Sequence, residues 1–140
     1  MKLKQILILV FMANIPVAFA QLSNEVELEI KNQSQLMFTL CKNLHQNPEL
    51  SLKEFETAKR MAAGLRDAGF EVTENFGGNN VVGVLKNGVG PVIMLRTDMD
   101  AWPVEEKTNL AFASTKKSEN DNGEVVSVMH ACGHDIHMSV

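Results

Sequence analysis

The chain has 140 residues, of which 45% are hydrophobic and 21% are charged, a composition that suits one globular domain or part of one. Its formal net charge of −4 excludes the basic surface of a nucleic-acid-binding protein, so we expect no nucleic-acid partner. No apolar run reaches the roughly 18 residues that a membrane-spanning helix needs, so we expect no membrane association of the mature chain.

Residues 1–20 have the layout of a secretory signal peptide. Lys2 and Lys4 form a short positive start, residues 6–13 are an unbroken apolar run, and Ala18-Phe19-Ala20 is a small-x-small cleavage site. The alternative is a buried N-terminal helix. Because charge, apolar run and cleavage site come in the order of a signal, we expect an exported protein, periplasmic or secreted, that begins after Ala20.

Two amphipathic helices are predicted next. Apolar residues recur at helical spacing over residues 27–45, and Asn47-Pro48 should end this helix because proline disfavours helical backbone at the residue before it. Ser51 and Glu54 have the spacing of a capping box, which predicts a second helix over residues 51–68. Gly69 is its expected end.

The pattern then changes to strands. Residues 70–73 form a short candidate strand, and residues 81–85 and 92–95 are nearly continuous apolar runs, as in strands buried on both faces. Asn87-Gly88 predicts a hairpin between these two runs. The polar segment 116–124 reads as a solvated loop. The sequence therefore predicts an α/β fold in which both helices cover one face of a mixed sheet.

The segment His130-Ala131-Cys132-Gly133-His134-Asp135-Ile136-His137 contains three of the four histidines of the chain. Imidazole and thiolate are the usual ligands of zinc, and carboxylate suits manganese. Cys132 and His134 flank a glycine that permits a tight bend, so both side chains can turn to the same side. The segment predicts a metal site whose remaining ligands lie elsewhere. The alternative is a loop that is rich in histidine by chance.

The two cysteines allow other readings. Cys132 as a nucleophile with His134 or His130 as its base would make the protein a cysteine hydrolase. In an oxidising compartment Cys41 and Cys132 can pair, although spacing alone does not show that their geometry permits it. Cys41 lies on an apolar helical stripe, where we expect it to act as a small buried hydrophobe.

The sequence also predicts an apolar strand that runs into two aspartates, Asp98 and Asp100, in the segment LRTDMDAWP at 95–103. Residues two apart on a strand face the same way, so both carboxylates can reach one cleft. They can equally be turn residues at a strand end. The residues alone leave both interpretations open.

RTDMDAWP at 96–103 and HACGHDIH at 130–137 resemble motifs of the M20 metallopeptidase family, in its amidohydrolase branch. That branch includes hippurate hydrolases, N-acyl amino acid amidohydrolases and indole-acetyl-amino-acid hydrolases. LHQNPELSLKEFETA at 44–58 and the block from 68 to 101 are similar to the preceding parts of the same branch. The four blocks follow one another in the order of the family and cover about residues 35–138.

The resemblance implies that Cys132 and His134 bind a pair of divalent ions (manganese, zinc, nickel or cobalt) and that Asp98 has a catalytic, orienting role. His130, Asp135 and His137 also match the motif, but the resemblance assigns no ligand role to them. The reaction it implies is hydrolysis of the amide bond of small N-acyl amino acids by a metal-activated water. Trp102 stands where the family usually has leucine, and the loop before Val128 is longer than usual.

The same resemblance implies that residues 21–140 are the N-terminal portion of a longer catalytic domain. The glutamate that acts as general base, the later ligands and a lid or dimerisation domain would lie outside this chain. We therefore expect the chain alone to be inactive, and a homodimer to form only through that further domain. The alternative is a truncated, non-catalytic chain that binds metal weakly.

Overall fold

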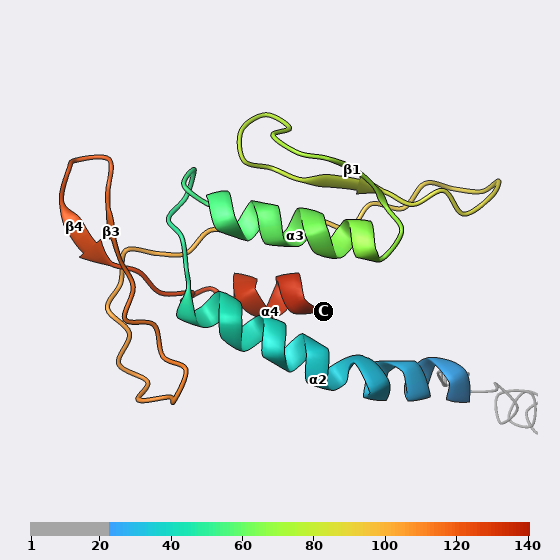
Figure 1. Cartoon of the computed structure of the whole chain (residues 1–140), viewed down its shortest axis with the longest axis horizontal. Coiled ribbons are helices and arrows are strands. Elements are labelled where there is room, and N and C mark those ends of the chain that lie inside the picture. The colour runs from blue at the N-terminus through green and yellow to red at the C-terminus, as the bar shows by residue number, and fades with distance from the viewer. Residues whose placement is uncertain (1–22) are drawn as a thin grey trace, which may run out of the picture. The chain divides into compact units, whose positions relative to one another are not determined.

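The structure, a computed structural model, describes residues 23–140 (Figure 1). The predicted signal peptide lies outside the described residues. The chain divides into two units, residues 1–32 and 33–140, and helix α2, Asn24–Gln46, begins in the first and ends in the second. No helix within residues 23–140 combines the length and the apolar character needed to cross a membrane.

The end of α2 is where the sequence predicts it. The helix stops at Gln46, directly before Asn47-Pro48. The Asn47 backbone N–H donates to the Leu44 carbonyl at 3.1 Å, and the Asn47 side-chain amide donates to the Asn43 carbonyl at 2.8 Å. Asn47 thus satisfies carbonyls of the last turn that have no partner within the helix.

Helix α3, Phe55–Asp67, begins later than predicted, and the capping box is wrong. Glu54 does not cap the helix, because one of its oxygens accepts the Leu52 N–H at 2.9 Å instead. The Glu49 carboxylate takes over this role and accepts the backbone N–H groups of Glu56 at 3.2 Å and Thr57 at 2.8 Å. A carboxylate from the preceding segment thus satisfies the first-turn donors and complements the helix dipole.

Gly69 ends α3, as the sequence predicts. It adopts a φ of 87°, a left-handed conformation that is unstrained only for glycine. The Phe70 N–H donates to the Leu65 carbonyl at 3.0 Å, and the Gly69 N–H donates to the Arg66 carbonyl at 2.9 Å. This pair of bonds is a Schellman motif, and it turns the chain directly into the first strand.

Strand β1, Glu71–Thr73, pairs antiparallel with β2, Val82–Val84, and Val72 lies opposite Gly83. Helix α3 packs against both strands (Figure 1). The turn between the strands is closed by the Phe76 N–H, which donates to the Asn80 carbonyl at 3.1 Å. The sequence correctly predicts strands in both places. It predicts, however, that residues 81–85 pair with residues 92–95, whereas in the structure β2 pairs with β1.

The predicted strand at residues 92–95 is wrong. The segment is an extended loop in which Val92 is 98% exposed and Leu95 95% exposed. The chain bends at residues 88–90, with Gly88 at a φ of 86°, but it forms no hairpin there. The physical reason is that β2 pairs with β1, and within residues 23–140 no strand offers its N–H and C=O groups to residues 92–95.

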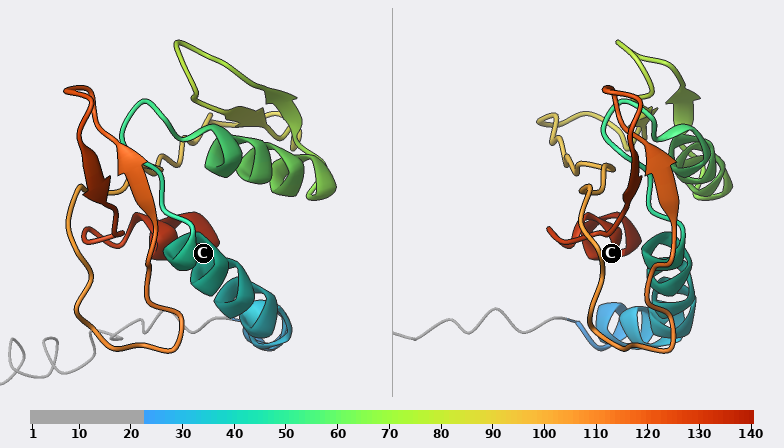
Figure 2. Two further views of the ribbon diagram at one scale, coloured as in Figure 1. Left: turned by 60° about the vertical axis from the view of Figure 1, so that its left-hand side comes forward. Right: turned by 90° about the vertical axis from the view of Figure 1, so that its left-hand side faces the viewer.

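The segment predicted as a solvated loop is in fact a second hairpin. Strand β3, Lys117–Glu119, pairs antiparallel with β4, Val125–Ser127, in a separate two-stranded sheet (Figure 2). The Asn120 side-chain oxygen accepts the N–H groups of Asn122 and Glu124, both at 2.9 Å. This turn chemistry lets a polar, exposed segment fold back on itself. The α/β class is confirmed, but in place of the predicted mixed sheet there are two small antiparallel sheets.

Three distant segments meet in a small core beneath the HACGHDIH segment. Ala101 donates its N–H to the Glu49 carbonyl at 2.7 Å in a parallel bridge. Trp102 and Met129 exchange N–H···O bonds, both at 2.9 Å, in an antiparallel bridge. The side chains of Leu50, Ala101 and Val128 are buried together. Residue 100 directly precedes the bridge at Ala101, and residue 130 directly follows the bridge at Met129. The bridges therefore fix the backbone next to both residues.

Helix α4, His134–Ser139, is the last element. Gly133 precedes it with a φ of 74°, again in the left-handed region. The N–H groups of Ile136 and His137 both donate to the Gly133 carbonyl at 3.1 Å. Gly133 therefore provides the sharp turn between Cys132 and His134 that the sequence predicts.

Candidate metal centre

Asp100 holds the imidazole of His134. The His134 Nδ1 lies 2.8 Å from the Asp100 carbonyl oxygen and 3.1 Å from its carboxylate Oδ1. Both partners are acceptors, so Nδ1 carries the proton and donates it. In the neutral ring this places the lone pair on Nε2, which is the form in which histidine binds a metal.

Cys132 lies just before Gly133 and His134 and is exposed. No hydrogen bond within residues 23–140 joins its thiol to an imidazole, as a cysteine nucleophile activated by histidine would need. A thiolate and an imidazole two residues apart form a soft ligand pair that suits zinc and its neighbours. Cys132 and His134 therefore fit part of a metal site.

Those two residues do not form a complete site. Within residues 23–140 no group of three or more His, Cys, Asp or Glu side chains is arranged to hold a metal ion. A zinc site needs at least three protein ligands. The ligand roles of Cys132 and His134 thus remain predictions, as does the statement that other ligands lie elsewhere.

Asp98 is placed differently from Asp100. Its carboxylate is partly exposed and forms an ion pair with Arg96, and its carbonyl accepts the Thr97 hydroxyl at 3.0 Å. The orienting role that the resemblance gives to Asp98 stays a prediction. In this structure the aspartate that contacts His134 is Asp100, which the sequence could have suggested, because residues two apart on an extended segment share a face.

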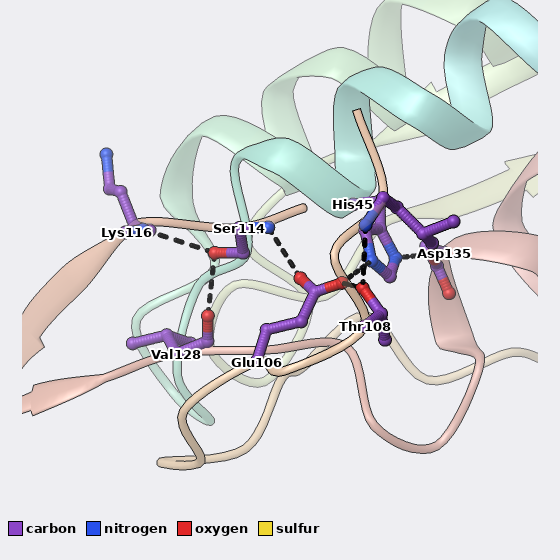
Figure 3. A network of polar contacts seen from close by, with 8 residues as sticks. His45, Glu106, Thr108, Ser114, Lys116, Val128 and Asp135 are labelled. Atoms are coloured by element: carbon purple, nitrogen blue, oxygen red, sulfur yellow. Dashed lines mark hydrogen bonds and ion pairs between the residues drawn. The ribbon is translucent and has the colours of Figure 1, made fainter. Parts of the chain in front are cut away.

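A second polar network lies next to the HACGHDIH segment and centres on His45 (Figure 3). The Nδ1 of His45 is 2.7 Å from Asp135 Oδ2, and its Nε2 is 3.1 Å from Glu106 Oε1. All three side chains are almost fully buried. Since both carboxylates accept, His45 donates from both nitrogens and is an imidazolium. Burial alone would lower the pKa of His45, but its hydrogen bonds to Glu106 and Asp135 raise it.

Glu106 is itself fixed by two further bonds. It accepts the Thr108 hydroxyl and, at 2.5 Å, the Ser114 backbone N–H. The Ser114 hydroxyl in turn donates to the carbonyl of Val128 at 2.7 Å (Figure 3). Burial alone would raise the pKa of Glu106, but the donors Thr108, Ser114 and His45 lower it. No sequence pattern marked Glu106 as a partner of His45.

Two buried groups beside this network lack a partner. Within residues 23–140, neither ring nitrogen of His130 and not the Oδ1 of Asp135 has a hydrogen-bond partner, although both residues are more than nine-tenths buried. Burial lowers the pKa of His130 and favours its neutral form. His137, by contrast, is exposed. The segment therefore divides into buried residues, His130 and Asp135, and more accessible ones, Cys132 and His137.

Cys41 is half-buried, so the prediction of a fully buried hydrophobe is only partly right. Burial and the nearby Asp135 carboxylate raise the pKa of its thiol, and a hydrogen bond with Ser139 opposes this. Both cysteines are free, so the structure contains no bond between Cys41 and Cys132.

Comparisons with known proteins agree with the geometry. The model of peptidase family M20/M25/M40 matches residues 94–140, which include Asp100, Cys132 and His134. The chain is 39% identical over 121 residues to thermostable carboxypeptidase 2 of Saccharolobus solfataricus, covering 85% of this chain and 28% of the relative. It is 48% identical over 95 residues to hippurate hydrolase of Campylobacter jejuni, covering 67% and 22%.

A solved structure shows the same fold. The crystal structure of the YXEP protein of Bacillus subtilis, described as a dinuclear metal binding peptidase from the M20 family, superimposes with a TM-score of 0.65. It is 34% identical, and the match covers 78% of this chain and 28% of that one. The chain is thus similar in sequence and in fold to members of the M20 family of peptidases. It spans about a quarter of the length of the relatives that it matches.

Proposed function

We propose that this chain supplies part of the catalytic domain of a metal-dependent amidohydrolase that cleaves N-acyl amino acids or related small amides. The observation that carries the proposal is the bond from His134 Nδ1 to Asp100, which leaves Nε2 free as a ligand. Cys132 on the same turn offers a second donor. This proposal treats residues 21–140 as the N-terminal portion of the catalytic domain.

Each residue has a defined task in this proposal. Cys132 and His134 would hold a divalent ion (manganese, zinc, nickel or cobalt), in a site that takes two such ions in the complete enzyme. Asp100 keeps the His134 ring in one orientation and one tautomer, so that Nε2 is presented without rotation. Bound divalent ions supply the Lewis acidity that polarises an amide carbonyl and activates water. The general base and the other ligands would come from parts of the protein outside these residues.

The substrate class follows from what two relatives share. Hippurate is an acyl group joined by an amide bond to glycine, and a carboxypeptidase cleaves the amide bond that precedes a terminal amino acid. In both cases the amide nitrogen belongs to an amino acid with a free carboxylate. This supports a small N-acyl amino acid as substrate, and it makes no use of a nucleic acid or a membrane. A homodimer formed through a further domain is part of the same proposal.

Export to the periplasm or medium is also proposed, on the layout of residues 1–20 alone. Mass spectrometry of the exported protein should find Gln21 at its N-terminus. An intact Met1 in the periplasmic or extracellular fraction would show that residues 1–20 are not a cleaved signal.

The test of the proposed function is hydrolysis of hippurate and of other N-acyl amino acids by a protein that joins this chain to the rest of its catalytic domain. We expect activity that EDTA abolishes and that manganese, zinc, nickel or cobalt restores. Activity that survives EDTA but is lost on alkylation of Cys132 would identify a cysteine hydrolase. Metal binding without hydrolysis of any such amide would identify a non-catalytic chain.

A further inference from the structure

We propose that His45 is a positioning residue, which sets the turn carrying Cys132 and His134 through its bond to Asp135. This inference rests on the proposed function, because it concerns the residues that would hold the metal. His45 lies at the end of helix α2, far in sequence from the turn that carries Cys132 and His134. Its effect on the turn must therefore pass through the tertiary contact with Asp135.

Asp135 directly follows His134 and lies in the first turn of α4, so whatever fixes its carboxylate also fixes the start of that helix. The bond from His45 Nδ1 to Asp135 Oδ2 is 2.7 Å long and buried. The second oxygen, Oδ1, has no hydrogen-bond partner. His45 is therefore the only hydrogen-bond donor that holds this carboxylate within the described part of the chain.

The other side of His45 is held firmly. Glu106 binds Nε2 and is itself held by Thr108 and by the Ser114 N–H. Through the Ser114 hydroxyl, this arrangement is joined to the carbonyl of the buried Val128. The ring of His45 is thus locked at Nε2, and Nδ1 presents one donor in one direction. His45 thus connects Glu106 to a buried side chain in the first turn of α4.

The two ring nitrogens can be tested separately. The amide nitrogen of asparagine can take the place of Nδ1, and the amide nitrogen of glutamine can take the place of Nε2. His45→Asn therefore keeps a donor for Asp135 and loses the one for Glu106. His45→Gln keeps the donor for Glu106 and loses the one for Asp135. Each variant loses one buried bond to a carboxylate, so a purely structural role of His45 predicts similar effects of the two.

The measurement is a titration, with Co²⁺ alone, of the protein that joins this chain to the rest of its catalytic domain, followed by the absorption bands of thiolate-bound cobalt from Cys132. A polar partner behind a metal ligand typically changes metal affinity about 10–100-fold when it is removed. His45 does not bond to His134 and acts on it only through Asp135, so we expect His45→Gln to weaken Co²⁺ binding about tenfold, at the low end of this range. His45→Asn should bind Co²⁺ within about twofold of the unmodified chain, because the link that matters is kept.

Gln46→Ala is the matched control, since Gln46 is the exposed neighbour of His45 on the same turn of α2. It should bind Co²⁺ as the unmodified chain does. Unfolding of the metal-free variants by urea shows whether His45→Asn and His45→Gln are destabilised to a similar extent. Affinity that follows metal-free stability in all variants, or equal affinities of His45→Asn and His45→Gln, would overturn the inference.

The two proposals fail in different ways. If the unmodified protein, joined to the rest of its catalytic domain, gives no thiolate–cobalt bands at any Co²⁺ concentration, the metal site of Cys132 and His134 is wrong, and the positioning role falls with it. If the unmodified protein gives the bands and His45→Gln gives them with the same affinity, the metal site stands and His45 has no positioning role.

Discussion

Replacing His45 by alanine should destabilise the fold strongly and in a pH-dependent way. The substitution removes two bonds to carboxylates, at 2.7 Å and 3.1 Å, from side chains that are 4% and 0% exposed. Removing one partner of a buried ion pair costs about 3–5 kcal/mol, because the remaining charge is left in a poorly solvated site. Glu106 keeps the donors Thr108 and Ser114, so the loss should lie at the lower end of this range.

The pH dependence follows from the direction of each shift. The pKa of His45 is raised above its ordinary value of 6.5, so its contribution is complete below 6.5 and is lost as the pH rises through the raised pKa. The pKa of Glu106 is lowered below 4.5, so its contribution is complete above 4.5 and is lost as the pH falls through the lowered pKa. The difference in the free energy of unfolding between the unmodified chain and His45→Ala should therefore be largest between pH 4.5 and pH 6.5.

Urea unfolding followed by circular dichroism, at a series of pH values, measures this difference. Burial and, after it, the charge of His45 lower the pKa of His130, so the substitution also changes the contribution of His130 to the pH dependence. Gln46→Ala should match the unmodified chain at every pH. A difference below about 1 kcal/mol would show that the network is as weak as an exposed ion pair. A difference that is constant with pH would show that His45 acts by packing, for instance through its edge-on contact with Phe112 at 5.5 Å between ring centroids.

Two further substitutions test the local structure by the same unfolding assay. Glu49→Gln should lower the free energy of unfolding by about 1 kcal/mol, because it weakens the charged acceptor of the Glu56 and Thr57 N–H groups. Ser51→Ala should lower it by less than about 0.5 kcal/mol. The opposite order would show that the predicted capping box does form. Gly133→Ala should lower the free energy of unfolding by about 1–2 kcal/mol and weaken metal binding, because the φ of 74° at residue 133 strains any residue with a Cβ. Unchanged stability would mean that this turn adopts another conformation.

The parts of the fold that the sequence predicts correctly have local causes. Gly69 and Asn47-Pro48 end their helices through backbone rules that act within a few residues. The helices themselves follow from apolar periodicity. The failures involve choices between partners. Residues 92–95 have the composition of a buried strand, but β2 already pairs with β1, and composition does not say which strand pairs with which.

The candidate site shows the same division. The ligand chemistry of Cys132 and His134 is visible in the sequence because both lie within one short segment. The contact of Asp100 with His134 depends on the bridges at Ala101 and Trp102, which join segments far apart in the chain. His45 and Glu106 are 61 residues apart in the sequence, and their pairing follows no periodic pattern. Such long-range polar contacts become visible only once the core has placed their backbones.

The central claim is that Cys132 and His134 bind a metal ion, and X-ray absorption spectroscopy of the zinc-loaded protein tests it most directly. We expect a sulfur neighbour at about 2.3 Å and nitrogen or oxygen neighbours at about 2.0–2.1 Å. The sulfur neighbour should disappear in Cys132→Ala and remain in Cys41→Ala. A zinc spectrum of the unmodified protein that contains only nitrogen and oxygen neighbours would contradict the account.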